Sequence, residues 1–257
     1  MEFIDTHTHL FLSDFDSDRS KVIEQAFEAG VNSLLLPNID SNSITGMMQL
    51  CEQYPGKCFP MIGLHPTSVK DDYKEQIAII KGHLKSQKFI AIGEVGIDLY
   101  WDKSFFTQQC DAFLIQLELA HEHSLPVVIH SRDSFDEIID LLKKNRTSYP
   151  YKGVFHSFTG TLEQANEAIS LGFKIGINGV VTFKNSSLGE VLKEVSLEHL
   201  LLETDSPYLT PTPHRGKRNE SSYLVYIAKK IAEIKQLTIE EVALTTTANA
   251  KTVFNLL

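Results

Sequence analysis

Short runs of apolar residues alternate with longer amphipathic stretches along the whole chain. Runs that are short and apolar at nearly every position are typical of strands buried on both faces, as in a parallel sheet. The pattern predicts eight such strands. They span residues 3–7, 31–38, 58–64, 89–94, 126–130, 153–158, 173–178 and 200–205.

The stretches between these runs have the spacing of helices that pack one face against a sheet. The clearest stripe follows positions i, i+4, i+7, i+11 and i+14, which share one side of a helix. It consists of Phe106, Cys110, Phe113, Leu117 and Ala120. Another helix is expected over residues 222–235, and a last one after Thr238, which has the spacing of a capping box with Glu241.

Helix start and stop signals lie at the ends of other stretches. Ser41 or Asn42 is expected to cap the helix after the second strand, because both side chains accept hydrogen bonds from free backbone N–H groups. Gly30 and Gly172 stand just before strands, where the end of a helix favours a residue with left-handed backbone. These signals agree with strands that alternate with helices.

Repeated strand–helix units predict an α/β fold, and eight units in 257 residues favour a (β/α)₈ TIM barrel. The alternative is a doubly wound open sheet, which typically has a glycine-rich phosphate loop after its first strand. The corresponding segment here, THTHLFLSDFD, contains no glycine. No linker-like segment divides the chain, so residues 1–257 are expected to form a single domain.

The composition, 42% hydrophobic and 22% charged, is that of an ordinary globular protein. The N-terminal residues MEFID do not resemble a signal peptide, and no apolar run reaches membrane-spanning length, so a cytoplasmic protein without membrane contact is expected. Cys51, Cys58 and Cys110 include no Cys-x-x-Cys pair, which favours reduced, buried thiols. The net charge of -9 argues against a basic nucleic-acid groove over the whole surface, although bound divalent cations would change the local charge.

Histidines and carboxylates stand near the ends of the predicted strands. His7 and His9 are two residues apart, so their imidazoles would point the same way from the end of the first strand. Four more side chains that can bind metal end apolar runs of their own. They are Glu94, His130, His156 and Asp205. Because buried ionisable groups are costly unless they are paired or bound to metal, the pattern predicts a metal centre at the C-terminal ends of the strands.

Four neutral imidazoles and two carboxylates can hold two divalent ions, with Glu94 as the central bridge. Two ions roughly 3.5 to 4 Å apart can generate hydroxide near neutral pH, so hydrolysis is the expected reaction. Asp205 is expected to bind one ion and to accept the proton of the attacking water. Histidine ligands suit zinc, whereas phosphodiester hydrolysis often uses magnesium or manganese, and the ligands alone do not decide between these metals.

Seven segments carry these residues in order along the chain: IDTHTHLF, IGLHP, IGEVGIDLYWD, VVIHSRD, VFHSFTG, ETDSPYLTP and RGKRNE. Together they resemble the TatD family of metal-dependent deoxyribonucleases, in the amidohydrolase superfamily. The resemblance spans essentially the whole chain and implies a TIM barrel, the six metal ligands above, and hydrolysis of DNA phosphodiesters from an end. One position departs from the family pattern, because Ser221 stands where proline often follows the asparagine–glutamate pair.

Other residues near the predicted centre are candidates for contact with a DNA substrate. His65 is expected to contact a phosphate or a leaving oxygen, unless it has only a structural role beside Pro66. Arg215 and Arg218, with Lys217 between them, follow the eighth strand and are expected to clamp phosphate oxygens. The alternative for these basic residues is a solvated loop.

Three further features have two interpretations each. Glu203 either lies beside the metal ligands and the substrate or pairs with a cation. Arg132 either contacts the substrate or pairs with Asp136 four residues later. Tyr100 and Trp101 either stack on a base of single-stranded nucleic acid or pack beneath their own loop.

The leading hypothesis is a metal-dependent deoxyribonuclease that acts on single-stranded DNA or DNA ends and needs no obligate protein partner. A relative that cleaves an amide or ester bond in a small molecule or an aminoacyl-nucleic acid would use the same metal centre. A third hypothesis is a metal-dependent nucleic-acid-binding protein without catalysis. A complete ligand set with a carboxylate base exceeds what binding alone requires.

Overall fold

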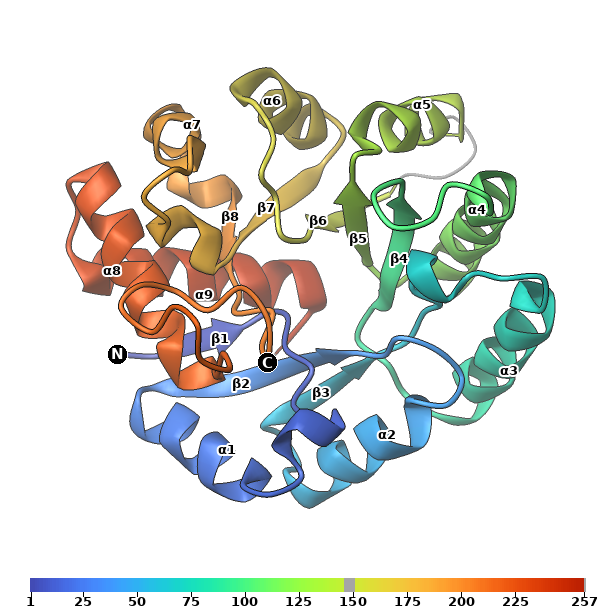
Figure 1. The fold of residues 1–257 in the computed structure, drawn as a ribbon, viewed down its shortest axis with the longest axis horizontal. Helices are drawn as coiled ribbons and strands as arrows, with labels where there is room; N and C mark the ends of the chain where they lie inside the picture. The colour runs from blue at the N-terminus through green and yellow to red at the C-terminus, as the bar shows by residue number, and fades with distance from the viewer. Residues whose placement is uncertain (146–150, 257) are drawn as a thin grey trace.

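Eight parallel strands form a ring surrounded by helices in the computed structural model, which describes residues 1–145 and 151–256 (Figure 1). In chain order the strands are β1 (Phe3–Asp5), β2 (Val31–Pro37), β3 (Cys58–Met61), β4 (Ile92–Asp98), β5 (Val127–Arg132), β6 (Gly153–Phe155), β7 (Phe173–Ile177) and β8 (Leu200–Leu202). The predicted α/β fold of the TIM-barrel type is confirmed, because each strand is followed along the chain by helical structure that lies outside the ring.

The strands pair as two parallel ladders, β1–β2–β3 and β4–β5–β6–β7–β8. The two ladders meet at two seams, where single bridges replace continuous pairing. Ile62 bridges Ile92 between β3 and β4, and Thr8 bridges Ser206 beside β1 and β8. Further backbone hydrogen bonds cross the second seam, such as the one from the Asp205 N–H to the His7 carbonyl oxygen at 2.9 Å.

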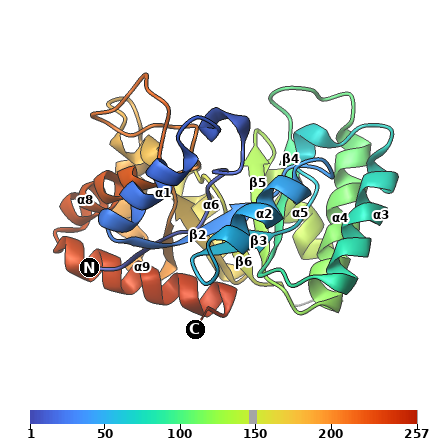
Figure 2. The same ribbon diagram turned by 90° about the horizontal axis from the view of Figure 1, so that it is seen from below.

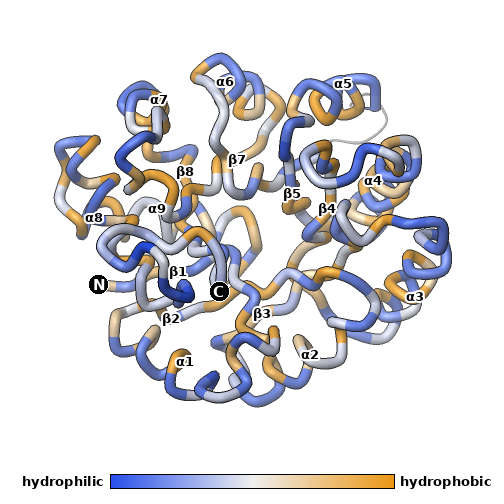
Figure 3. The backbone as a smooth tube through the Cα atoms, in the orientation of Figure 1, coloured by the Kyte–Doolittle hydropathy of each residue, from blue (hydrophilic) through white to orange (hydrophobic). Residues whose placement is uncertain are grey.

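Helices cover the outside of the ring through their apolar faces. They are α1 (Arg19–Glu28), α2 (Ile44–Gln53), α3 (Tyr73–Ser86), α4 (Phe106–Glu122), α5 (Phe135–Asn145), α6 (Leu162–Ser170), α7 (Leu188–Glu194), α8 (Leu224–Lys235) and α9 (Ile239–Phe254). In Figure 3, hydrophobic and hydrophilic stretches alternate along these helices, as amphipathic helices require. In the described ranges no helix combines the length and apolar character needed to cross a membrane.

The apolar stripe predicted on α4 is largely buried. Phe113, Leu117 and Ala120 are buried and Cys110 is partly buried against the core. Phe106 differs from the prediction, because it begins the helix and remains 37% exposed. The first turn of α4 therefore projects beyond the part of the helix that the sheet covers.

The last helix, α9, closes one end of the barrel. Figure 2 shows it running beneath the strands, on the side opposite the long loops. Ala250, Val253 and Phe254 of α9 pack in one apolar cluster with residues from inside the ring. Those inner residues include Ile4, Leu35, Met61, Val128, Val154 and Leu201, which come from six different strands. Apolar packing thus fills this end, and polar side chains gather at the other.

The predicted strand boundaries differ from the observed ones, most of all at β3, β4, β6 and β8, and β3 stops at Met61 instead of residue 64. β4 starts at Ile92 instead of residue 89 and continues past Glu94, while β6 and β8 stop before the segments that carry His156 and Asp205. In those segments the N–H groups of His156 and Asp205 still donate to neighbouring backbone, but the next or preceding N–H groups donate to carboxylates: Ser157 to Glu203 at 2.6 Å and Thr204 to Asp5 at 2.9 Å. Side-chain acceptors therefore end the strands early.

Helix ends agree with the sequence signals at three places out of four. Thr238 and Glu241 form the predicted capping box of α9. Gly30 and Gly172 have φ of 87° and 98°, the left-handed conformation expected after α1 and α6. The prediction of a cap at residue 41 or 42 was wrong, because the N-cap of α2 is Ser43.

Substitution at Gly153 tests how tightly β5 and β6 approach. A Cβ atom at Gly153 would collide with the backbone of Val127, whereas Gly82 on α3 is exposed and has free space around its Cα. We expect Gly153→Ala to lower the free energy of unfolding by about 1–3 kcal/mol and Gly82→Ala to raise it by about 0.5–1 kcal/mol. Urea-unfolding midpoints of the two variants check this. Equal stability of Gly153→Ala and wild type would contradict the close approach.

Candidate metal centre

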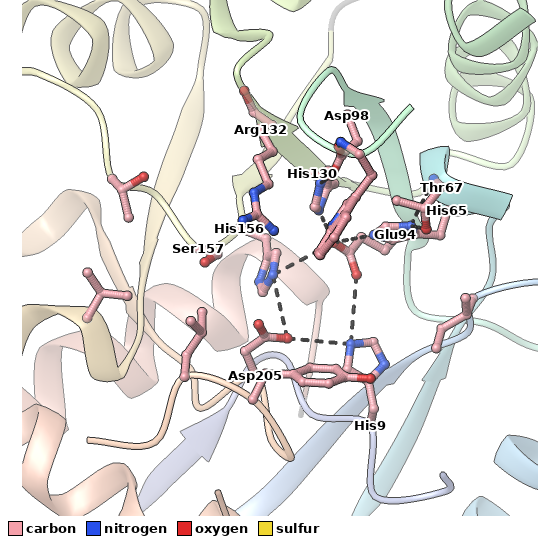
Figure 4. Close-up of a pocket in the computed structure, with 17 residues that line it drawn as sticks. His9, His65, Thr67, Glu94, Asp98, His130, Arg132, His156, Ser157 and Asp205 are labelled. Carbon is pink, nitrogen blue, oxygen red and sulfur yellow. Dashed lines mark hydrogen bonds and ion pairs between the residues drawn. The ribbon is translucent and has the colours of Figure 1, made fainter. Parts of the chain in front are cut away.

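The six predicted ligands meet at the end of the barrel opposite α9. His7 and His9 follow β1, Glu94 lies within β4, and His130 lies within β5. His156 follows β6, and Asp205 follows β8. All six except the fully buried His7 line a cavity of about 680 Å³, which is also lined by His65, Thr67, Trp101, Arg132 and Tyr208, among others (Figure 4). Strands far apart in sequence therefore place these side chains together.

Glu94 is the centre of the group. Its Oε2 atom lies 3.1 Å from Nε2 of His7 and 3.8 Å from Nε2 of His9. Its Oε1 atom lies 2.8 Å from Nδ1 of His130 and 3.7 Å from Nε2 of His156. The two oxygens of one buried carboxylate thus face two different sets of imidazoles (Figure 4).

Asp205 completes the set on the side of His7 and His9. Its Oδ1 atom lies 3.5 Å from Nε2 of His9 and 3.8 Å from Nε2 of both His7 and His156. The backbone of Asp205 is left-handed, with φ of 58°, which is strained for a residue other than glycine. The hydrogen bond from its N–H to the His7 carbonyl oxygen holds this conformation.

The arrangement fits divalent cations. Nε2 of His7 and Nε2 of His9 are only 3.2 Å apart, and their Nδ1 atoms are buried without a hydrogen-bond partner among the described residues. Three sets of ligand atoms each lie within 4.8 Å of one another: His7, His9 and Asp205; His7, Glu94 and His156; His65, Glu94 and His130. Imidazole nitrogens and carboxylate oxygens packed this closely are the donor set of zinc and related metals.

Burial and the neighbouring charges favour an ionised Glu94 and a neutral His7, the forms that bind metal, but a protonated His156. Burial opposes ionisation of Glu94, but His65, His7 and His156 hold its pKa well below the ordinary value. Burial lowers the pKa of His7, and His156 lowers it further. The pKa of His156 is raised to about 10 despite burial, because Glu203, Glu94 and Asp205 surround it. A bound cation would take the place of that proton.

Glu203 lies behind His156 and away from the cavity. It is fully buried, its Oε1 atom is 2.9 Å from Nδ1 of His156, and it accepts a hydrogen bond from the Ser157 N–H. This position agrees with the interpretation that Glu203 lies beside the metal ligands, and Glu203 is not among the residues that line the cavity. Its carboxylate instead orients the imidazole of His156, as carboxylates behind metal-bound histidines do. Gly176 leaves room for it, because a Cβ there would collide with the Glu203 carboxylate.

Asp98 is a residue of the site that the sequence analysis missed. Its Oδ2 atom lies 2.8 Å from Nε2 of His130, so His130 sits between two carboxylates, those of Asp98 and Glu94. The signal was present in the sequence, because positions 94, 96 and 98 alternate along one face of a strand. It was overlooked because the predicted strand ended at Glu94.

Asp5 supports the opposite side of the site. Its buried carboxylate accepts hydrogen bonds from both the backbone N–H and the hydroxyl of Thr204, at 2.9 and 2.6 Å. Burial raises the pKa of Asp5 to about 7, against the effect of these hydrogen bonds. Because Asp5 ends β1 and Thr204 adjoins Asp205, the contact ties the segment of His7 to that of Asp205.

His65 faces the cavity as predicted. Its Nε2 atom lies 3.4 Å from Oε1 of Glu94, and its Nδ1 atom lies 2.7 Å from the hydroxyl of Thr67. Its ring meets that of His130 edge to face, with the centroids 4.5 Å apart. His65 therefore lies beside the ligand group, close enough to Glu94 and His130 to join them around a cation.

Arg215 and Arg218 are not among the cavity-lining residues. Both amino groups of Arg218 donate to Asp18 at 2.8 Å, and one also reaches Glu220. Arg215 stacks on the ring of Phe183 and donates to a backbone carbonyl oxygen. The guanidinium of Arg218 is therefore paired with acidic side chains. The spacing of residues in the sequence did not reveal these partners.

Arg132 lines the cavity, and among the described residues no other lysine or arginine does so. Its guanidinium lies 3.8 Å from the ring centroid of Tyr100 and 5.4 Å from that of Trp101. Within the described residues it forms no ion pair, so the predicted alternative of a pair with Asp136 does not occur. A cation held by aromatic rings keeps its charge free for an anion in the cavity.

The sequence of the chain is similar to those of known proteins over nearly its whole length. The sequence model of TatD-related DNases matches residues 4–255. An uncharacterized metal-dependent hydrolase, YabD of Bacillus subtilis, is 42% identical, and the alignment covers 98% of each chain. A protein of Erwinia tasmaniensis named 3'-5' ssDNA/RNA exonuclease TatD is 33% identical over 98% of this chain and 99% of its own.

Solved structures agree with these sequence matches. The crystal structure of YjjV, a TatD homologue from Escherichia coli, superposes with a TM-score of 0.93 and 30% identity over 99% of this chain and 98% of its own. A phosphotriesterase homology protein from the same species superposes with a TM-score of 0.74 at 13% identity, over 98% of both chains, which shows a shared fold alone. The chain is therefore a metal-dependent hydrolase that belongs to the family of TatD-related DNases.

Proposed function

We propose that this protein binds two divalent cations and hydrolyses phosphodiester bonds of single-stranded DNA from an end. The observation that carries the proposal is the position of Glu94, whose two oxygens face two separate sets of imidazoles. A carboxylate in this position is suited to bridge two ions. A single-ion site would need only one of the two sets.

The ligands divide naturally between the two oxygens of Glu94. His7, His9 and Asp205 would hold one ion together with Oε2, while His130 and His156 would hold the other together with Oε1. A pair of ions in such a site activates water and stabilises both the attacking and the leaving oxygen. Magnesium, manganese and zinc all remain candidates, because the site mixes imidazole with carboxylate ligands.

Asp205 is the proposed general base. Burial opposes its ionisation, but His156, His9 and His7 lower its pKa, so the carboxylate is ionised. Oδ1 faces the histidines, which leaves Oδ2 to accept the proton of the attacking water. Asp205 also lines the cavity, where a substrate phosphate would enter. A general base must lie within hydrogen-bond reach of that water, and the position at the cavity floor permits this.

Arg132 is the proposed contact for the substrate phosphate. It lines the same cavity as the ligands and has no carboxylate partner among the described residues. A guanidinium binds phosphate oxygens in a bidentate manner. The name of the Erwinia tasmaniensis relative, a ssDNA/RNA exonuclease, supports a single-stranded nucleic acid as the substrate.

The first experiment removes metal with EDTA and restores magnesium, manganese or zinc before adding end-labelled single-stranded DNA. We expect cleavage only with metal restored, and a loss of about 10²- to 10⁴-fold in kcat for Asp205→Asn, which removes the base. Asp140→Asn, an exposed change on α5, is the matched control. Undiminished cleavage by folded Asp205→Asn would reject the base. Absence of cleavage with every metal, in protein that holds two ions, would favour an amide or ester substrate.

The bridging position of Glu94 predicts how ligand variants bind metal. We expect wild type to hold two ions per chain, His9→Ala to hold one, and Glu94→Gln to lose both because its charge serves both ions. His123→Ala, an exposed histidine at the end of α4, is expected to keep two. Elemental analysis of dialysed protein gives the counts. Two ions in Glu94→Gln would show that this carboxylate is not a bridge.

Two arginines can be compared for their effect on DNA cleavage. Arg132→Ala should raise KM for single-stranded DNA about ten- to 100-fold, because a charge-assisted contact to phosphate is lost. Arg218→Ala should affect KM less and lower the thermal midpoint more, because it leaves Asp18 and Glu220 unpaired. Steady-state kinetics and thermal unfolding of both variants provide the comparison. A larger rise in KM for Arg218→Ala than for Arg132→Ala would contradict this and favour the phosphate clamp that the sequence predicts.

A further inference from the structure

Two aromatic residues beside the metal centre are exposed to solvent. Tyr100 is 53% exposed and Trp101 is 69% exposed, although large aromatic side chains usually bury most of their surface. Both belong to the loop between β4 and α4, and Trp101 lines the cavity that contains Glu94 and Asp205. We call Tyr100, Trp101 and Arg132 the aromatic shelf.

The aromatic shelf has a defined internal geometry. The rings of Tyr100 and Trp101 meet edge to face, with centroids 5.0 Å apart and an interplanar angle of 88°. Arg132 covers Tyr100 at 3.8 Å. Arg132 lies closer to Tyr100 than to Trp101, whose ring centroid is 5.4 Å away, and 69% of Trp101 remains exposed to a flat partner.

Hydrogen bonds fix the shelf relative to the metal centre. Oδ1 of Asp98 accepts from the backbone N–H groups of Tyr100 and Trp101, at 3.0 and 3.1 Å. Oδ2 of the same carboxylate lies 2.8 Å from Nε2 of His130. The buried side chain of Gln109 bonds both the N–H and the carbonyl group of Asp98. The aromatic loop is thus held in place before any ligand binds, which lowers the entropic cost of binding.

An exposed indole next to an unpaired guanidinium matches the chemistry of an unpaired nucleotide. A base in a single strand presents a free face that can stack on an aromatic ring, and the adjoining phosphate can meet arginine. In a duplex, neighbouring bases cover the inner faces, and pairing with the opposite strand keeps even the terminal base from turning onto a side chain. We propose that Trp101 is a nucleobase-binding subsite that selects substrates with an unpaired terminal nucleotide. This inference rests on the proposed function, because it assigns the base of the same substrate.

Cleavage kinetics test the subsite through a cycle of protein and substrate changes. The substrates are a single-stranded oligonucleotide and the same oligonucleotide with abasic sugars at its terminal two positions. We expect wild type to show a KM about tenfold or more lower for the base-bearing substrate, and Trp101→Ala to lose this preference. Trp101→Phe should keep much of it. Leu244→Ala, which alters an exposed residue on α9, should behave as wild type.

Fluorescence provides a test that does not depend on catalysis. Trp101 is the single tryptophan of the chain, so the intrinsic emission reports on this ring. We expect the metal-loaded Asp205→Asn variant to show quenching on addition of the base-bearing oligonucleotide and little change with one made entirely of abasic sugars.

The outcomes separate the inference from the proposed function. Quenching by bases without cleavage by wild type would support the subsite and reject the nuclease. If Trp101→Ala changes KM equally for the two oligonucleotides, or changes neither KM, the subsite is rejected. The proposed nuclease activity is still supported in that case, because cleavage occurs. Equal quenching by both oligonucleotides would also overturn the subsite, because a phosphate contact alone would then explain the signal.

Discussion

The structure depends on holding ionisable side chains together in a buried place without leaving their charges uncompensated. Glu94 is 2% exposed, and five imidazoles lie within 4 Å of its two oxygens. Burying such groups separately would cost several kcal/mol each. The surrounding layer consists of further acids, Glu203 behind His156 and Asp98 behind His130, which fix the orientation of each ring. Regular strand pairing shifts or ends beside three of the ligands, Glu94, His156 and Asp205, whereas His130 lies within the β4–β5 ladder.

This requirement explains why the two ends of the barrel differ. At one end, inner side chains of six strands pack against α9 without polar partners. At the other, strands are short or irregular, and hydrogen bonds run from backbone to carboxylates such as those of Asp5 and Glu203. The seam beside β1 and β8 is closed by the contacts that also position His7 and Asp205. The same contacts therefore close the ring and bring the residues of the site together.

Sequence patterns predicted the parts of the molecule that depend on local rules. Apolar runs located all eight strands, and the Thr238–Glu241 capping box was correct, because burial and capping act within a few residues. The proximity of the six predicted ligands followed from strand-end positions in a barrel. Asp98 was missed because the predicted strand stopped at Glu94, although the alternation of positions 94, 96 and 98 is a local pattern, whereas the pairing of Arg218 with Asp18 follows from no local rule. This pairing depends on a partner 200 residues away, which no spacing rule identifies.

The tie between β1 and the segment after β8 has a consequence for synthesis of the chain on the ribosome. β1 can pair with β2 early, but its other edge has no partner until residues 200–206 have been made. An open strand edge invites pairing with other chains. Because α9 covers the inner residues of β1 and β8, the apolar floor also stays exposed until α9 has been made. The growing chain therefore carries an unpaired strand edge until residues 200–206 have been made, and an uncovered apolar floor until α9 follows.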